Sequence, residues 1–88
     1  MYRFEATQLI LRHAGDRPIV GNLGPTSDEL RHAGHRDRNF YTYGNMGLCS
    51  SLALGMALGT AEQVISLDGD GSLLMNLGTI GTIGRESP

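Results

Sequence analysis

Short apolar runs alternate along this chain with longer segments that have the spacing of helices. The runs are rich in β-branched or aromatic residues, which favours strands, and they lie near residues 18–23, 39–43 and 63–68. The helical segments lie near residues 3–13, 27–33, 48–58 and 72–80. Strands that alternate with helices are typical of βαβ units. The pattern therefore predicts an α/β fold, a three-layer parallel sheet with helices on both faces.

The segment from residue 48 to residue 58 has no polar face. Leucine and methionine side chains occur all round it, with Ser51, Ala53, Gly55 and Ala57 between them. A helix that is apolar on every side is buried on most sides. Three strands and a few helices cannot surround it, and exposed apolar patches mark interfaces. We therefore expect the chain to be part of an oligomer and to associate through this helix.

Glycines stand where each predicted strand ends and the next helix begins. They lie within residues 21–24, 44–47 and 69–71. In an open parallel sheet these connections all lie at the carboxyl ends of the strands, where ligands bind. We therefore expect three loops that are distant in sequence to form one site.

Composition narrows the function further. The 88 residues carry a formal net charge of −2, and the seven basic residues are scattered arginines, which does not suggest nucleic-acid binding. With a single cysteine, Cys49, no internal disulfide can form, and a reducing compartment is expected. The N-terminus lacks the apolar stretch of a signal peptide, and no apolar run has the roughly 20 residues that a membrane span needs. A cytoplasmic protein without membrane contact is expected.

The third glycine loop has the chemistry of a metal–diphosphate site. Asp70 stands between Gly69 and Gly71, so its carboxylate lies at the end of a strand, and a helix is expected to begin at Ser72. Free N–H groups at a helix start bind phosphate oxygens. Mg²⁺ typically takes one or two carboxylates together with phosphates. The alternative interpretation is a tight structural turn that Asp70 caps.

Other polar residues have structural interpretations. Thr26 and Glu29 have the spacing of a capping box, which places a helix start near Ser27. The charged residues of the 36–38 segment, Arg-Asp-Arg, are expected to form a surface loop, although one arginine could reach an anionic substrate. Cys49 lies in an apolar segment and is expected to be a small core residue.

Three segments resemble motifs of the superfamily of thiamine-diphosphate (ThDP)-dependent decarboxylases and acetolactate synthases. Residues 65–76 are similar to its ThDP-binding motif, and residues 44–55 to its glycine–methionine–glycine turn and the small-residue helix that follows. Residues 19–30 resemble its first strand and Gly-x-Thr-Ser loop. The resemblance covers nearly the whole chain, and within the superfamily it is greatest to the sulfopyruvate decarboxylase β subunit and the phosphonopyruvate decarboxylases.

The resemblance implies that residues 1–88 are the N-terminal part of a diphosphate-binding domain with ThDP and Mg²⁺ as cofactors. Asp70 would be the first Mg²⁺ ligand. The side chain of Met46 would lie beneath the cofactor between its two rings, and its carbonyl would accept a hydrogen bond from the aminopyrimidine. Backbone N–H groups of Gly71 and Ser72 would bind the diphosphate. The cofactor-binding positions that the resemblance implies are Gly24, Thr26, Ser27, Gly44, Asn45, Met46, Gly69, Asp70, Gly71 and Ser72.

Two parts of the family's apparatus have no counterpart in this sequence. The family's asparagine pair, which supplies the second metal ligand, lies farther beyond Gly71 than this chain extends, so we expect a domain truncated after the third strand with an incomplete metal site. The glutamate that protonates the aminopyrimidine belongs to a pyrimidine-binding domain, which the resemblance places in a partner domain or α subunit. The chain is therefore expected to hold no catalytic residue and to be inactive alone.

The resemblance implies a subunit or fragment of a ThDP- and Mg²⁺-dependent lyase. Its substrate would be a small 2-oxo acid, a 3-substituted pyruvate such as sulfopyruvate or phosphonopyruvate. Two alternatives remain: an enzyme of the acetolactate synthase type, or a non-catalytic nucleotide-binding or assembly module on a Rossmann-like sheet. A Rossmann dehydrogenase is disfavoured because no Gly-x-Gly-x-x-Gly follows the first strand, and a P-loop is disfavoured because the chain has no lysine.

Overall fold

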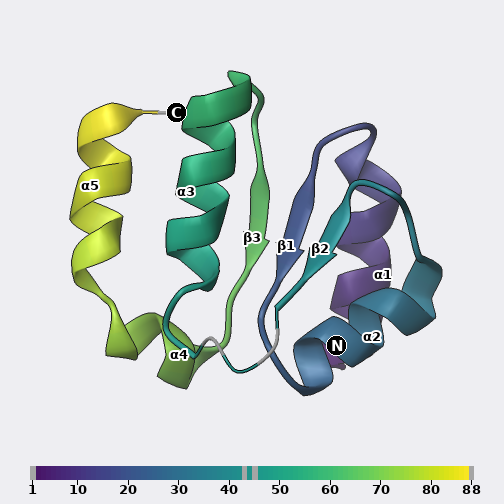
Figure 1. The fold of residues 1–88 in the computed structure, drawn as a ribbon. Helices are drawn as coiled ribbons and strands as arrows, with labels where there is room; N and C mark the ends of the chain where they lie inside the picture. The colour runs from purple at the N-terminus through teal and green to yellow at the C-terminus, as the bar shows by residue number, and fades with distance from the viewer. Residues whose placement is uncertain (1, 43, 45, 88) are drawn as a thin grey trace.

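The computed structural model describes residues 2–42, 44 and 46–87. Within them, a three-stranded sheet lies between two layers of helices (Figure 1). In chain order the elements are α1 (Arg3–Ala14), β1 (Ile19–Gly21), α2 (Pro25–Gly34), β2 (Asn39–Tyr41), α3 (Cys49–Thr60), β3 (Ile65–Leu67), α4 (Asp70–Met75) and α5 (Gly78–Glu86). The strand–helix alternation that the sequence predicts is thus present, with one additional helix at the end.

The sheet is parallel, with the strand order β2-β1-β3. The central strand β1 places Ile19 opposite both Asn39 and Ile65. Each strand has three residues and is shorter than predicted. Pro18 has no N–H to contribute to a ladder, so only its carbonyl bonds to the neighbouring strand, and the N–H of Asn22 makes the last bond between β1 and β3. The predicted α/β fold with a parallel sheet is confirmed.

Adjacent side chains of β1 divide the core between the two faces of the sheet. Ile19 packs with Ala14 of α1 and Leu30 of α2. Val20 packs with Cys49 of α3. Because successive side chains of a strand point to opposite faces, α1 and α2 cover one face and α3 covers the other (Figure 1). Helices on both faces are confirmed.

The inner side of α3 is buried against β1 and β3. Cys49 is fully buried there, and this burial raises the pKa of its thiol. A hydrogen bond with Ser66 opposes the increase in pKa, and the charge of Asp68 adds to it. The thiol therefore stays protonated at neutral pH, which confirms Cys49 as a core residue. In the part of the chain that the structure describes, no helix combines the length and the hydropathy of a membrane span.

The predicted capping box at the start of the second helix is wrong. α2 begins at Pro25, so Thr26 already lies in the first turn, and no side chain caps the helix. Glu29 instead accepts three hydrogen bonds from the guanidinium of Arg3 in α1, at 2.6 to 3.0 Å. This hydrogen bonding lowers the pKa of the Glu29 carboxyl. A contact between two helices, rather than a local cap, decides where the Glu29 side chain lies.

The segment after β3 forms two helices instead of the one predicted over residues 72–80. α4 begins earlier, at Asp70, and the helical backbone is interrupted at Asn76, with φ −139° and ψ 50°. The Asn76 side chain donates to Ser51 Oγ of α3 at 3.0 Å. The same Ser51 oxygen lies 2.9 Å from Thr79 Oγ1 in α5. Ser51 of α3 therefore contacts both Asn76, where the helix is interrupted, and α5. The helical spacing of residues 72–80 could not reveal a contact with a different helix.

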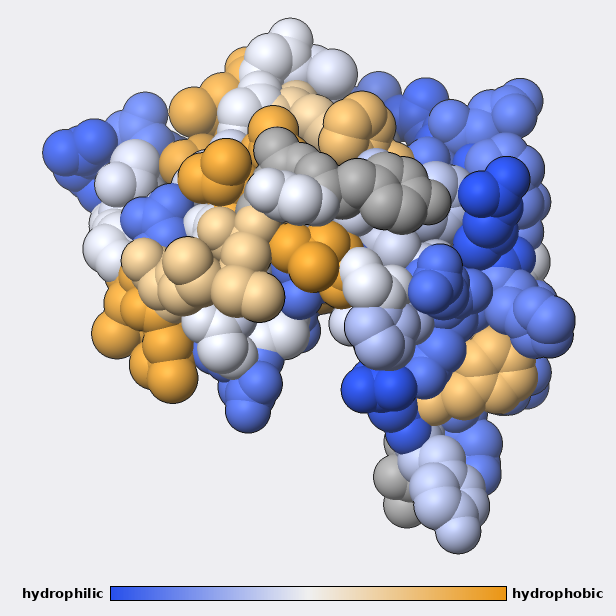
Figure 2. Space-filling view, turned by 60° about the horizontal axis from the view of Figure 1, so that its bottom comes forward, coloured by the Kyte–Doolittle hydropathy of each residue, from blue (hydrophilic) through white to orange (hydrophobic). Residues whose placement is uncertain are grey.

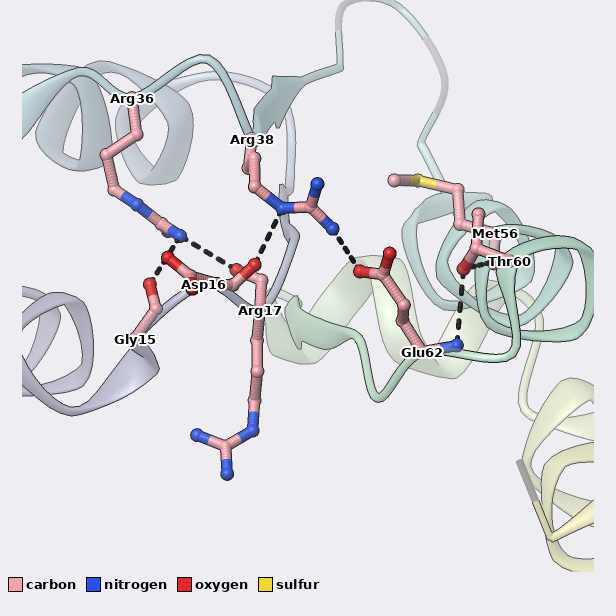
Figure 3. A network of polar contacts seen from close by, with 8 residues as sticks. All are labelled: Gly15, Asp16, Arg17, Arg36, Arg38, Met56, Thr60 and Glu62. Carbon is pink, nitrogen blue, oxygen red and sulfur yellow. Dashed lines mark hydrogen bonds and ion pairs between the residues drawn. The ribbon is translucent and has the colours of Figure 1, made fainter.

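Two arginines before β2 form polar contacts with the loops that precede the other two strands (Figure 3). Arg36 donates to the carbonyl oxygens of Gly15 and Arg17 at 2.8 and 2.9 Å. Arg38 pairs with Glu62 and donates to a carbonyl of the same α1–β1 loop. These loops lie at the amino ends of parallel strands, at the opposite edge of the sheet from the glycine loops. Their position favours the structural interpretation over a contact with substrate.

Replacing Arg36 is expected to destabilise the fold without affecting the glycine loops. Arg36→Ala removes the bonds to two backbone carbonyls and a third to Asn39 Oδ1 at 2.9 Å. Because these bonds come from a charged, half-buried donor, the free energy of unfolding should fall by about 1–2 kcal/mol. Urea denaturation measures the change. Arg12→Ala, which removes the same charge from the exposed surface of α1, should change the stability by less than about 0.5 kcal/mol; equal losses would contradict the assignment.

Candidate cofactor-binding site

The three glycine loops meet at the carboxyl edge of the sheet, at the bottom of Figure 1. A Cβ added to Gly69, after β3, would lie only 2.8 Å from Asn22 Nδ2, after β1. The N–H of Gly47, in the loop after β2, donates to Ser72 Oγ of α4 at 2.8 Å. Direct contacts therefore connect the β3–α4 loop to the first loop, and the first turn of α4 to the second. The three loops lie together at one edge of the sheet, as the sequence predicts.

The first loop joins β1 to α2. Gly24 has a φ of +76°, which favours glycine, and α2 begins at the next residue. The Ser27 hydroxyl is buried and donates to the carbonyl of Asn22 at 2.5 Å, so it points inward. Thr26 is half-buried and lines a hollow of about 260 Å³ together with Arg3 and Asp68. Of the two predicted donor residues, only Thr26 borders open space.

The second loop contains the Gly-x-Met-Gly turn. Asn45, which the sequence assigned to the site, lies outside the described residues. Gly44 and Gly47 have φ angles of +64° and +90°. A side chain at Gly47 would also meet Met75 Cβ at 3.1 Å, so the turn is seated directly on α4. Met46 is 53% exposed, which leaves its side chain available to a ligand.

The third loop presents the carboxylate of Asp70 to solvent. Asp70 is the first residue of α4, and its Oδ1 accepts the N–H of Gly71 at 2.8 Å. Gly71 is exposed, with no other atom within 4 Å of an added Cβ. Ser72 is only 4% exposed, because its hydroxyl is directed at Gly47. The carboxylate and the open glycine backbone therefore lie at the surface, while the serine side chain lies inside.

Two residues that the sequence analysis did not assign to the site lie at the same edge. Asn22 Oδ1 and Asp68 Oδ2 are buried side-chain oxygens without a hydrogen-bond partner. Buried acceptors without a partner are costly and call for a donor. Both residues directly follow a strand, at the carboxyl end where ligands bind. That position is the signal by which Asn22 could have been found in the sequence.

Apolar side chains border the site on the side of α3, α4 and α5. Figure 2 looks onto the carboxyl edge, and the hydrophobic surface gathers there, whereas the α1–α2 side is hydrophilic. The large hydrophobic residues exposed in this region are Met46, Leu48, Leu74, Met75, Leu77 and Ile80. The edge therefore combines a charged, glycine-lined part with an apolar part.

The residues present fit a metal–diphosphate pair better than a metal ion alone. Among the described residues, no group of three or more His, Cys, Asp or Glu side chains could hold a metal. Asp70 supplies one exposed carboxylate, oriented by its bond to Gly71. Mg²⁺ is commonly held by one or two carboxylates, with phosphates and waters completing its shell. A cation at Asp70 would therefore depend on oxygens of a bound diphosphate.

Comparison with known proteins identifies the kind of domain to which this edge belongs. Residues 20–88 match the family model described as "Thiamine pyrophosphate enzyme, C-terminal TPP binding domain". Thiamine pyrophosphate (TPP) is another name for ThDP. The matched region begins in β1 and contains all three glycine loops.

Individual relatives agree with the family match. The chain is 44% identical over 86 residues to the sulfopyruvate decarboxylase subunit beta of Methanococcus maripaludis, covering 98% of this chain and 46% of that subunit. It is 47% identical over 87 residues to the subunit beta of Methanocaldococcus jannaschii, with the same coverage. It is 42% identical over 73 residues to the phosphonopyruvate decarboxylase of Streptomyces viridochromogenes, covering 83% of this chain and 18% of that protein. The chain thus spans less than half the length of these relatives.

Proposed function

The chain belongs to the thiamine pyrophosphate enzymes, as part of their C-terminal TPP-binding domain, and on this premise we propose that it binds the diphosphate of ThDP with Mg²⁺ in a 2-oxo-acid decarboxylase. We propose a 3-substituted pyruvate, of the sulfopyruvate or phosphonopyruvate class, as the substrate. The names of the relatives support this substrate class.

One observation carries the cofactor assignment more than any other. The three glycine loops are packed closely together: a Cβ at Gly69 would lie 2.8 Å from Asn22 of the first loop, and the N–H of Gly47 in the second loop donates to Ser72 at the start of α4. This packing places the exposed Asp70 carboxylate and the half-exposed Met46 side chain on one edge. A diphosphate with an apolar, ring-bearing remainder requires both kinds of surface.

Residue roles follow from the exposed groups. Asp70, which accepts the N–H of Gly71, would hold Mg²⁺, and the cation would neutralise the diphosphate. The backbone N–H of Ser72, in the first turn of α4, would donate to phosphate oxygens, and Gly71 would leave space for them. Gly24 and Thr26 would border the diphosphate from the first loop, and Met46 would supply apolar contact to the rings. The bound cofactor supplies the carbanion chemistry of decarboxylation. The chain's own contribution is binding and orientation.

The complete active site would include a partner. We propose that a pyrimidine-binding domain or α subunit supplies the glutamate that protonates the aminopyrimidine. The relatives named as beta subunits support a complex of more than one subunit. A cytoplasmic location is also proposed, and the single, buried cysteine agrees with a reducing compartment.

Two measurements test the proposed function. Calorimetric titration of ThDP should show binding with Mg²⁺ and its loss in the presence of a chelator. Release of CO₂ from sulfopyruvate, phosphonopyruvate and pyruvate should be absent with the chain alone and should appear, for a 3-substituted pyruvate, when a pyrimidine-binding subunit is added. Mg²⁺-independent binding of ThDP would reject the metal assignment. Condensation of two pyruvates in the complex would favour the acetolactate synthase type instead.

A further inference from the structure

Ser72 connects the second glycine loop to the third through its side chain. Its hydroxyl accepts the N–H of Gly47 at 2.8 Å, and both groups are buried. Gly47 has a φ of +90°, and a Cβ added there would lie 3.1 Å from Met75 Cβ, so the turn packs closely against α4 at this point. A buried amide that loses its acceptor pays a desolvation cost. This hydrogen bond therefore sets how the Met46 turn lies relative to Asp70.

α4 itself is held in place independently of this bond. Asn76, at its end, donates to Ser51 Oγ of α3 at 3.0 Å, and Ser51 Oγ lies 2.9 Å from Thr79 Oγ1. The position of α4 relative to α3 therefore has its own polar contacts. The hydrogen bond of the Ser72 hydroxyl is a separate contact, which joins α4 to the turn.

We propose that Ser72 is a positioning residue, whose hydroxyl holds the Met46 turn at a fixed separation from the Asp70 loop so that one ligand contacts both. The inference rests on the proposed function and deepens it. It differs from a direct role of the Ser72 side chain, because the hydroxyl is directed to Gly47 and the residue is 4% exposed. It predicts that the hydroxyl matters for a ligand that spans both loops and not for one that occupies the Asp70 loop alone.

The bond is tested first without any ligand, in the chain of 88 residues by NMR. Ser72→Ala should increase the hydrogen-exchange rate of the Gly47 amide about tenfold, because a lost bond of this kind is worth about 1.4 kcal/mol. Thr60→Ala, which removes an exposed hydroxyl at the far end of α3, should leave the Gly47 rate unchanged. If Ser72→Ala does not fold, Ser72→Thr and Ser72→Val replace it, since they differ only in hydroxyl against methyl. An unchanged Gly47 rate in the variant without the hydroxyl overturns the proposal.

The positioning role is tested with two probes, ThDP and inorganic diphosphate, each with Mg²⁺. Ser72→Ala should weaken ThDP about tenfold and inorganic diphosphate less than about twofold, whereas Thr60→Ala should weaken neither. Equal weakening of both probes would mean that the hydroxyl contacts the diphosphate itself. Unchanged ThDP binding would mean that the bond is structural only. Either result overturns the positioning role. If the unsubstituted chain binds neither probe, the proposed function is wrong, and the role of Ser72 in cofactor binding is wrong with it. The hydrogen-exchange rates still show whether the bond between Ser72 and Gly47 exists.

Discussion

Asp70→Asn is expected to abolish the Mg²⁺-dependent part of ThDP binding. The amide keeps the oxygen that accepts the Gly71 N–H, but it removes the negative charge that would attract the cation. The ThDP affinity with Mg²⁺ should therefore fall at least about tenfold, to the level seen with a chelator. Because Asp70 is the single carboxylate assigned to the metal, the unsubstituted chain itself should bind weakly. Calorimetry at high protein concentration, or NMR titration, measures both affinities.

The control for this experiment is Asp37→Asn. Asp37 precedes β2 and therefore lies at the amino edge of the sheet, opposite the glycine loops. Asp37→Asn thus removes the same charge as Asp70→Asn, but far from the site. It should leave the affinity unchanged within about twofold. Asp70→Ala also removes the acceptor for the Gly71 N–H, and its ThDP affinity with Mg²⁺ should be no higher than that of Asp70→Asn. Tight, Mg²⁺-dependent binding that survives both substitutions at Asp70 contradicts its assignment as the metal ligand.

Gly55→Phe is expected to weaken association of the chain strongly while leaving its fold intact. Gly55 lies on the exposed side of α3, where an added Cβ meets no atom within 4 Å. The monomer can therefore accept the ring, and replacing a helical glycine should slightly favour the helix. If α3 packs closely against a partner, overpacking costs about 1–3 kcal/mol, a loss of affinity of about tenfold or more. Sedimentation at micromolar concentration measures the association, and thermal unfolding measures the fold.

The association has a physical reason in the described structure. Leu48 and Leu58, at the two ends of α3, are 43% and 52% exposed. Gln8→Phe, on the α1 side of the sheet, adds the same aromatic ring to the opposite layer and should not affect association. The interface is not on α3 if the unsubstituted chain sediments as a stable monomer, or if the two variants behave alike.

The α/β fold could be predicted from the sequence because it depends on local properties. β-branched and aromatic runs form the strands, and amphipathic or small-residue segments form the helices, whichever neighbours they later meet. Parallel pairing follows from the alternation, and it brings the three glycine loops to one edge. The sequence alone therefore places Gly47 and Gly69 at this edge. The apolar segment that contains Cys49 likewise required burial.

Only the tertiary structure decided which polar atoms meet. Glu29 has the local spacing of a capping residue, yet it binds Arg3, because the packing of α1 against α2 brings that charge nearer than the helix end. Asn76 interrupts a helix that its own neighbours would continue, because Ser51 of α3 accepts its side-chain N–H.

The same limit applies within the site. Ser72 was assigned to the site through its backbone, and nothing in the local pattern showed that its hydroxyl would accept the N–H of Gly47, from a loop 25 residues earlier. Asn22 was not singled out at all, although it packs against Gly69. The hydrophobic periodicity of a sequence indicates which residues face the core, because side chains repeat with the period of their own helix or strand. A hydrogen bond between distant segments depends on the position of two atoms in space, which is determined only when the elements pack together.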